Sequence, residues 1–185
     1  MATETAPNEK SEKRADRPAA EAAGGKSPEA KPLAIERLTH EDVGEIVQLF
    51  RRVWEPYLTG LPPEVQRRWQ PTPLEFTSGM EGVTYFAAKR GGKIIGVIGC
   101  RMVDGACHLL HLCVDVEHRR HGIGTALLAA GLGWSQHANA RSIYGDVLAR
   151  FPEALGLFKA CGFTEAGLLH RHFWGEDVRV FEKIL

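Results

Sequence analysis

One segment constrains the fold more than any other, because it leads from an apolar run through a glycine-containing turn into a helix-like run. Residues 106–116 are mostly apolar, which is typical of a buried strand, and residues 122–137 repeat apolar side chains at helical spacing. Residues 142–148 are again typical of a strand. A strand–helix–strand connection places its two strands parallel in one sheet, so this segment predicts an α/β unit.

Two tight turns add strands to this unit. Gly91-Gly92 separates the strand patterns at 84–90 and 93–103, and Asp104-Gly105 separates the second of these from 106–116. These three segments therefore predict an antiparallel meander. Further strands are expected at 33–38, 163–173 and 178–185.

Helix signals complete the domain. Thr39 and Asp42 form a capping-box pattern before an amphipathic segment, and Pro152 and Gly162 bound a second helix pattern. Residues 55–79 hold several prolines, which predicts short helical pieces and loops that shape a pocket. We expect an α/β (α+β) fold whose mixed, mostly antiparallel central sheet has about seven strands and about four flanking helices.

Composition bounds the class of protein. A chain of 185 residues with 44% hydrophobic content builds one good core, so we expect one domain over residues 32–185. Residues 1–31 contain no aromatic residue and almost no large apolar residue, which predicts a disordered N-terminal tail. Lys plus Arg and Asp plus Glu both number 23, so no global charge favours nucleic acid or a membrane surface as partner.

The setting is expected to be cytoplasmic and reducing. No apolar run reaches the length of a membrane span, and the N-terminus is too acidic for a signal or transit peptide. The chain contains no CxxC pair, and its cysteines fall in apolar patterns, as buried free thiols do: Cys100, Cys107, Cys113 and Cys161.

The glycine turn has the chemistry of an anion site. A helix N-terminus leaves main-chain N–H groups unpaired, and Gly122 and Gly124 let those groups approach an anion closely. Arg119 and Arg120 add positive charge. A P-loop would need a Lys after the second glycine, and a dinucleotide fold would place the turn after its first strand, so neither of these nucleotide sites fits.

Two motifs resemble one known family. RRHGIG at 119–124 is similar to the Arg/Gln-x-x-Gly-x-Gly/Ala signature of the GNAT superfamily of acyl-CoA-dependent N-acyltransferases. ALGLFKACGF at 154–163 resembles the AxxLYxxxGF motif of the same family, with Ala154, Leu157, Gly162 and Phe163 at the matching positions. The resemblance covers about residues 33–185 and implies a V-shaped splay between the fourth and fifth strands.

The resemblance also implies how acetyl-CoA is held. The loop would bind the CoA pyrophosphate, and the pantetheine arm would lie in the splay beside the main chain of the fourth strand. A main-chain N–H there would polarise the acetyl carbonyl. The predicted cofactor-binding residues are Leu112, Cys113, Val114, Arg119, Arg120, His121, Gly122, Ile123, Gly124, Thr125 and Phe158.

Two side chains are the candidate catalytic residues. Acyl transfer needs a neutral amine, and His108 lies at the fourth-strand position where family members carry a Glu or His base. Asp146 matches a fifth-strand position where some protein N-terminal acetyltransferases carry a basic Glu. His111 is three residues from His108 and faces the other side of a regular strand, although a bulge would reverse that.

Two positions depart from the family pattern. Phe158 stands where many relatives have a Tyr that protonates the leaving thiolate, so the sequence does not identify the residue that would act as general acid. Tyr57, Tyr85 and Tyr144 are the alternatives. Phe151 likewise stands where relatives often have an Asn.

The remaining histidines and aromatic residues were weighed for metal and substrate binding. His170 and His172, like His118 and His121, form His pairs, but the sequence offers no further ligands at a known spacing, so we expect no metal. The substrate pocket is expected from residues 54–80 and the final strand pair, with these candidates for its wall: Trp54, Tyr57, Trp69, Phe76, His172 and Trp174.

The sequence therefore predicts an N-acetyltransferase that uses acetyl-CoA. The acceptor would be a primary amine, on a small molecule or on a protein N-terminus or lysine, and would attack the thioester directly. The alternative is a non-catalytic acyl-CoA-binding regulator, which the absence of the Tyr favours. A third hypothesis is that the tail at 1–31 carries the function and that the domain is only its scaffold. The sequence leaves the acyl length and the assembly, monomer or homodimer, open.

Overall fold

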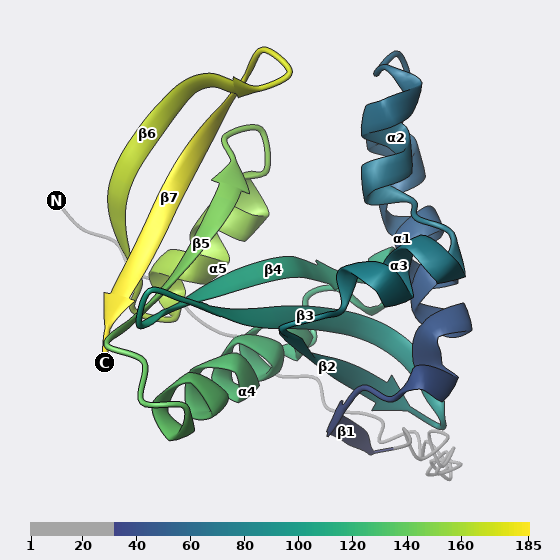
Figure 1. Cartoon of the computed structure of the whole chain (residues 1–185), viewed down its shortest axis with the longest axis horizontal. Coiled ribbons are helices and arrows are strands. Elements are labelled where there is room, and N and C mark those ends of the chain that lie inside the picture. The colour runs from purple at the N-terminus through teal and green to yellow at the C-terminus, as the bar shows by residue number, and fades with distance from the viewer. Residues whose placement is uncertain (1–31) are drawn as a thin grey trace, which may run out of the picture. The chain divides into compact units, whose positions relative to one another are not determined.

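The computed structural model describes residues 32–185, so the predicted tail at 1–31 lies outside the described residues. The described chain forms one seven-stranded sheet of order β1-β2-β3-β4-β5-β7-β6, shown in Figure 1. All neighbouring strands are antiparallel except β4 and β5, which are parallel. The meander, the parallel pair and the final strand pair are all as predicted. The strands are β1 (Leu33–Arg37), β2 (Val83–Arg90), β3 (Lys93–Val103), β4 (Ala106–Val114), β5 (Ser142–Leu148), β6 (Thr164–Phe173) and β7 (Glu176–Ile184).

Five α-helices flank the sheet in the described residues, one more than expected, because the proline-rich segment folds into two short helices. Both of these helices begin at a proline, which suits the first helical turn. None of the helices within residues 32–185 has both the length and the apolar character that crossing a bilayer requires. The helices are α1 (Val43–Leu58), α2 (Pro63–Trp69), α3 (Pro73–Gly79), α4 (Ile123–His137) and α5 (Pro152–Ala160), with short 3-10 turns at His40–Asp42 and Val116–His118.

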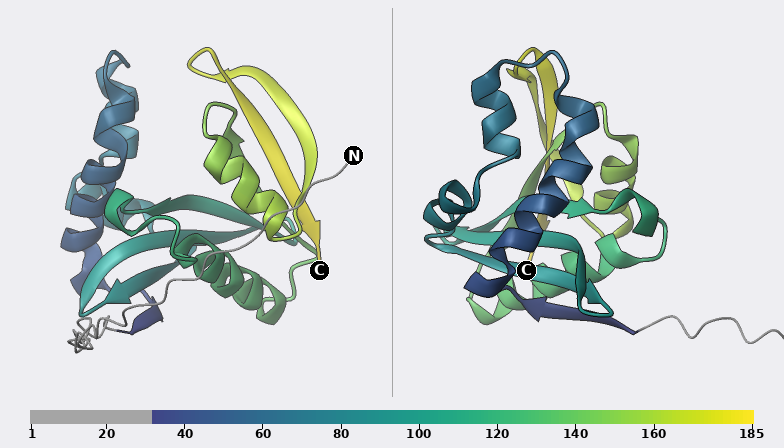
Figure 2. Two further views of the ribbon diagram at one scale, coloured as in Figure 1. Left: turned by 180° about the vertical axis from the view of Figure 1, so that it is seen from behind. Right: turned by 90° about the vertical axis from the view of Figure 1, so that its right-hand side faces the viewer.

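The sheet carries a hydrophobic core on each face. On one face α1 and α3 pack Ile46, Phe50 and Phe76 against the meander. On the other face α4 packs Leu127 and Leu128 against β3, β4 and β5, and Phe158 of α5 joins the same cluster. The two views of Figure 2 show α1 and α4 on opposite sides of the strands.

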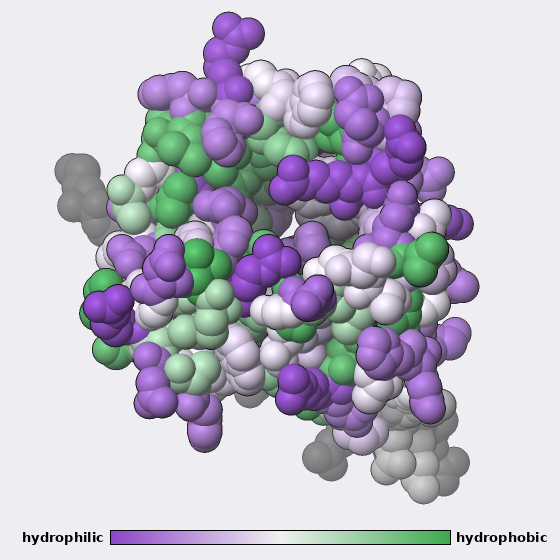
Figure 3. Space-filling view, in the orientation of Figure 1, coloured by the Kyte–Doolittle hydropathy of each residue, from purple (hydrophilic) through white to green (hydrophobic). Residues whose placement is uncertain are grey.

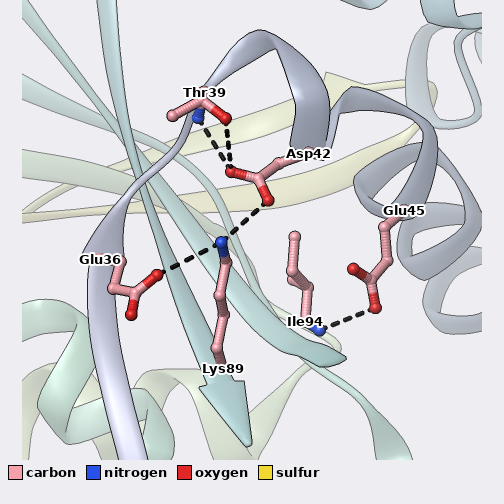
Figure 4. Close-up of polar contacts among 6 residues, drawn as sticks. All are labelled: Glu36, Thr39, Asp42, Glu45, Lys89 and Ile94. Atoms are coloured by element: carbon pink, nitrogen blue, oxygen red, sulfur yellow. Dashed lines mark hydrogen bonds and ion pairs between the residues drawn. The ribbon is translucent and has the colours of Figure 1, made fainter. Parts of the chain in front are cut away.

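The start of α1 is fixed to the meander by a small polar network, shown in Figure 4. The Asp42 carboxylate accepts hydrogen bonds from the Thr39 N–H at 2.9 Å and the Thr39 hydroxyl at 3.1 Å, so the predicted capping box forms. Lys89 of β2 bridges Asp42 at 2.9 Å and Glu36 at 3.3 Å. Glu45 accepts a hydrogen bond from the Ile94 N–H at 2.9 Å, which ties α1 to the turn between β2 and β3.

Strands β4 and β5 part soon after they meet. Their parallel pairing runs only from Ala106↔Ser142 to Leu109↔Gly145. Beyond that point β4 stays paired with β3, whereas β5 stays paired with β7. The edge of β4 that faces the gap, from Leu110 to Val114, therefore has no strand beside it in the described sheet, and the expected splay is present (Figure 1).

A β-bulge interrupts β4 just beyond the splay point. Val97 of β3 pairs with Cys113 and Gly99 pairs with Leu110, so Ile98 faces two residues of β4. His111 lies in this bulge with a φ of 52°, in the left-handed region. The bulge resets the side-chain alternation of β4, and this decides where His111 points.

Candidate active site

A cavity of about 590 Å³ lies where β4 and β5 part. Its wall comes from α2, β4, β5 and the β6–β7 hairpin. The hollow opens on the face shown in Figure 3, between the part formed by β6 and β7 and the part formed by α2, with hydrophilic residues along part of its rim. The lining residues are Arg68, Trp69, His108, Leu109, Leu110, His111, Asp146, Leu148, Arg171, His172, Phe173, Trp174, Gly175 and Val178.

The two predicted catalytic residues meet in this wall. His108 Nε2 lies 3.0 Å from Asp146 Oδ2. The strand register explains the meeting, since His108 pairs with Tyr144 and Asp146 is two residues further along β5. The Tyr144 ring stacks on the His108 ring, with centroids 4.5 Å apart and planes 5° from parallel. The imidazole is therefore oriented by a carboxylate at its edge and an aromatic ring on its face.

His111 lines the same cavity as His108, because the bulge turns it to that side. Its Nδ1 lies 2.8 Å from the hydroxyl oxygen of Tyr85, which is 3% exposed. His111 is an exposed residue of the cavity wall, yet desolvation by the protein packed around its ring, together with the charges of Arg68, Arg101 and His108, lowers its pKa to about 4. Burial also raises the pKa of Tyr85 to about 12, against the opposing charge of Arg101. Both groups are therefore neutral at pH 7.

Gly99 makes room for this pair. It stands opposite Tyr85 in the register of β2 and β3, and a Cβ there would lie 2.8 Å from the Tyr85 ring. The Tyr85–His111 pair was not foreseen as a unit, although both residues were separately named. The only sequence signal for it was the option of a bulge in the strand.

The glycine turn forms an open loop at the start of α4. Arg120 and Gly122 have φ angles of 65° and 74°, both in the left-handed region. Within residues 32–185, the main-chain N–H groups of 120–125 donate no hydrogen bond, and Ala126 is the first donor of the helix, to the Gly122 carbonyl. Backbone of this kind presents successive N–H groups to one concave side, which is the geometry of an anion nest.

The side chains of this loop have separate roles. The Arg119 guanidinium donates to the Val114 carbonyl at 3.1 Å, which fixes the loop to the end of β4, whereas Arg120 and His121 are exposed. His121 Nδ1 lies 2.7 Å from the Arg119 carbonyl oxygen. Gly124 has a packing role that the sequence did not indicate, because a Cβ there would lie 2.8 Å from a methyl group of Leu157 on α5.

Phe158 lies beneath the point where β4 and β5 part. Its ring is 3% exposed and packs against Phe163 and Phe181. A Cβ on Gly145 would lie 2.9 Å from the ring, and Gly145 is the last β5 residue paired with β4. Phe158 is therefore part of the core beside the splay, and both its match to the family's Tyr and its contact with a cofactor stay predictions.

The other candidates for the pocket wall divide into three groups. Trp69, His172 and Trp174 line the cavity as predicted. Trp54 and Tyr57 instead contact Phe151, with ring centroids 6.2 Å and 5.0 Å away, in an aromatic cluster beside the cavity. Phe76 is buried against Phe50 and Tyr85, so it belongs to the core. Arg68 and Arg171 were not predicted, since no local pattern distinguishes these two surface arginines, one on α2 and one on β6, from the others in the chain.

The cysteines of the described chain are free thiols. Cys100, Cys107 and Cys113 are buried free thiols and Cys161 is a half-buried one. In the part of the chain that the structure describes, no group of three or more His, Cys, Asp or Glu side chains has the arrangement of a metal site. His170 lies near Asp177, with 3.6 Å between Nδ1 and Oδ2.

Comparison with known proteins identifies the family. The model of the acetyltransferase (GNAT) family matches residues 44–163, which is more than half of the chain. The chain belongs to this family. The matched range contains the His108–Asp146 pair, the glycine loop and α5 of this GNAT protein, but it ends before the β6–β7 hairpin that supplies part of the cavity wall.

Relatives by sequence carry related names. Human N-acetyltransferase 8B is 29% identical over 103 residues, which cover 52% of this chain and 45% of that protein. An N-alpha-acetyltransferase of Sulfurisphaera tokodaii is 32% identical over 108 residues, which cover 50% of this chain and 64% of that protein. The chain thus spans about half the length of the relatives it matches.

Solved structures share the GNAT fold. The Escherichia coli ribosomal-protein-S18-alanine N-acetyltransferase has a TM-score of 0.67 at 20% identity, covering 83% of this chain and 94% of that one. The PaiA N-acetyltransferase of Thermoplasma acidophilum, solved in complex with coenzyme A, has a TM-score of 0.70 at 16% identity, covering 83% of this chain and 99% of that one. At these identities the likeness establishes the fold.

Proposed function

We propose that this protein is an N-acetyltransferase that transfers an acetyl group from acetyl-CoA to a primary amine. The observation that carries the proposal is the His108–Asp146 pair, which faces a cavity at the splay of β4 and β5. A base at that place lies beside the strand edge along which the family is expected to hold its thioester. Family membership and the names of the relatives support the same activity.

The glycine loop fits the pyrophosphate of CoA. Six successive N–H groups, those of residues 120–125, are without hydrogen bonds in the described chain, and the Arg120 side chain is exposed beside them. The free edge of β4 at Leu112, Cys113 and Val114 would pair with the pantetheine arm, and an N–H of that edge would polarise the acetyl carbonyl. The coenzyme A complex of the Thermoplasma neighbour supports this ligand.

The reaction follows from these positions. The amine nitrogen attacks the carbonyl carbon of the thioester, so a C–N bond forms, and the C–S bond then breaks as CoA leaves as its thiolate. His108 takes the proton that the amine loses, directly or through one water, and Asp146 stabilises the imidazolium that results. The product is the N-acetylated amine.

A second function is favoured by one observation. Phe158 has no hydroxyl and is buried beneath the splay, so it offers no proton to the leaving thiolate. A non-catalytic acyl-CoA-binding regulator would tolerate this side chain. The CoA thiol is acidic enough to leave as a thiolate at modest cost, however, so the enzyme remains the better account.

Two measurements on the full chain distinguish these functions. Titration calorimetry with CoA and acetyl-CoA tests the ligand, and thiol release in the presence of an amine panel with N-terminal peptides tests the transfer. Binding with turnover of at least one amine supports the enzyme, whereas binding without turnover of any amine supports the regulator. No binding of either ligand would overturn both.

A further inference from the structure

The cavity wall carries an excess of positive charge close to the proposed base. Two arginines, Arg68 on α2 and Arg171 on β6, line it together with one acidic residue, Asp146. The whole chain has a formal net charge of zero, so this excess is local. Because charges in a concave wall focus their field into the cavity, the excess bears on what the cavity binds.

The carboxylates near the cavity already have basic partners. Asp146 bonds His108, Glu176 pairs with Arg150 at 3.3 Å, and Asp177 lies 3.6 Å from His170. Asp177 also accepts a hydrogen bond from the main-chain N–H of Arg171 at 2.8 Å, which uses the backbone of that residue and not its guanidinium. Among residues 32–185, no carboxylate lies within ion-pair distance of the Arg68 or Arg171 guanidinium.

The charge of Arg68 reaches the centre of the site. After burial, it is the next cause of the lowered pKa of His111, and Arg101 acts in the same direction. The field at the cavity wall therefore disfavours a second cation beside His111. It favours an anion on the bound acceptor for the same reason.

The rest of the wall is apolar and aromatic. Trp69, Phe173 and Trp174 stand beside the two arginines, and Trp174 is 53% exposed in the turn between β6 and β7. A polycation would be repelled by the two positive charges and would gain little from the apolar surface. In an amine with an apolar body and one anionic group, the anion would pair with the arginines and the apolar body would pack on the aromatic side chains.

We propose that the acceptor is a primary amine that also carries a carboxylate, which Arg68 and Arg171 hold while the amine faces the His108–Asp146 pair. The carboxylate comes either from a free α-amino acid or from an acidic residue next to a peptide N-terminus. The inference rests on the proposed function for the acetyl transfer to this amine. The preference of the cavity for a ligand with a carboxylate is a binding property and can be tested without turnover. Arg171 lies on the hairpin beyond the range that matches the family, which suits a residue that sets acceptor preference.

Matched acceptor pairs test this preference on the full chain. Phenylalanine is compared with phenylalaninamide, and an amidated peptide beginning Ala-Glu is compared with one beginning Ala-Gln, with spermidine as the cationic amine. The amine of phenylalaninamide is less basic than that of phenylalanine, so a larger fraction of it is neutral and reactive at pH 7. This difference favours the amide, so amine basicity alone would not produce faster turnover of phenylalanine. Both kcat/KM by thiol release and Kd by calorimetry in the presence of CoA are measured.

We expect the acidic member of at least one pair to bind about tenfold tighter than its amide, and spermidine to bind worst. The pair that shows the preference identifies the source of the carboxylate. Arg68→Gln and Arg171→Gln should each reduce the preference about threefold or more, while the Lys variants should keep more of it than the Gln variants, because they keep the charge but not the two-pronged hydrogen bonding of Arg. Arg67→Gln is the matched control, because Arg67 is on the same helix but outside the cavity wall.

The outcomes separate the two proposals. A preference in Kd without turnover supports this inference and overturns the proposed transfer reaction. Turnover with equal or tighter binding of the amides or of spermidine overturns this inference and leaves the transfer reaction standing. An Arg67→Gln variant that loses as much preference as Arg68→Gln would also overturn it, because the effect would then be one of general surface charge.

Discussion

His108 and Asp146 come from neighbouring parallel strands and meet, with 3.0 Å between Nε2 and Oδ2, just where those strands separate. The His108 side chain is 21% exposed and that of Asp146 is 44% exposed, so the pair is reachable from the cavity. A base held in this way can receive a proton from an amine that enters the hollow, and its carboxylate partner fixes the orientation of the ring.

Removal of the base is the first test of this arrangement. We expect His108→Ala to lower kcat by about a hundredfold or more and to abolish the limb of the pH–rate profile that reports the base, with little effect on acetyl-CoA binding. Asp146→Asn should lower kcat about tenfold, because it keeps the shape of the partner but not its charge. Steady-state kinetics across pH measure both.

The matched control is His111→Gln. The pKa of His111 is about 4, so this group does not change charge in the neutral range and its variant should keep the limb. Loss of the limb in His111→Gln but not in His108→Ala would assign the base to His111 instead.

Acid stability gives a second test, this time of the environment of His111. An unfolded His has a pKa of about 6.5, whereas the folded His111 has a pKa of about 4, so the unfolded chain binds more protons between these values. The stability that neutral His111 contributes is complete above about pH 6.5 and is lost as the pH falls toward 4. Urea denaturation at pH 7 and pH 5 measures the loss.

His111→Gln should make this loss smaller, because Gln does not titrate. His137→Gln serves as control, since His137 lies near the end of α4 and outside the cavity wall. Equal acid sensitivity in the wild type and His111→Gln would contradict the lowered pKa.

The left-handed conformation of Gly122 gives a third prediction. A side chain at a φ of 74° is strained, so we expect Gly122→Ala to destabilise the fold by about 1 kcal/mol and to weaken CoA binding by about tenfold. Gly133→Ala is the matched control on the same helix, because nothing lies within 4 Å of a Cβ there and its φ is not left-handed. That variant should be neutral or more stable by up to about 1 kcal/mol.

Thermal denaturation and calorimetry with CoA measure the two effects. If a folded Gly122→Ala variant binds CoA as tightly as the wild type, the loop does not bind the CoA pyrophosphate.

Local sequence signals predicted most of the fold. The seven strands, the Thr39–Asp42 capping box and the proline at the start of α5 each depend on residues close together in the chain, so their chemistry could be recognised there. The His108–Asp146 contact spans 38 residues, but regular parallel pairing brings the two strands together, and the sequence predicts both residues though not their contact.

The features that were missed depend on irregular or distant geometry. His111 changes side because of one bulged residue, and period-two alternation cannot locate a bulge. Arg68 and Arg171 share a wall because α2 and the β6–β7 hairpin both border the hollow, which no local pattern encodes. Gly124 stays a predicted part of the anion site, whereas its close approach to Leu157 depends on how α4 packs against α5, which no local pattern encodes.

Phe158→Tyr is the last prediction, and it bears on whether the splay holds an enzyme. The para carbon of Phe158 lies 2.9 Å from the position of a Cβ on Gly145, so a hydroxyl on that carbon would lie near the last β5 residue that pairs with β4. We expect this variant to raise kcat about tenfold by giving the leaving thiolate a proton, at a cost of about 1 kcal/mol in stability for the buried hydroxyl. Phe163→Tyr is the control, because Phe163 is buried in the same core cluster but is not beside Gly145, so it should lose stability without gaining rate. A folded Phe158→Tyr variant with unchanged kcat would mean that departure of the thiolate does not limit the rate.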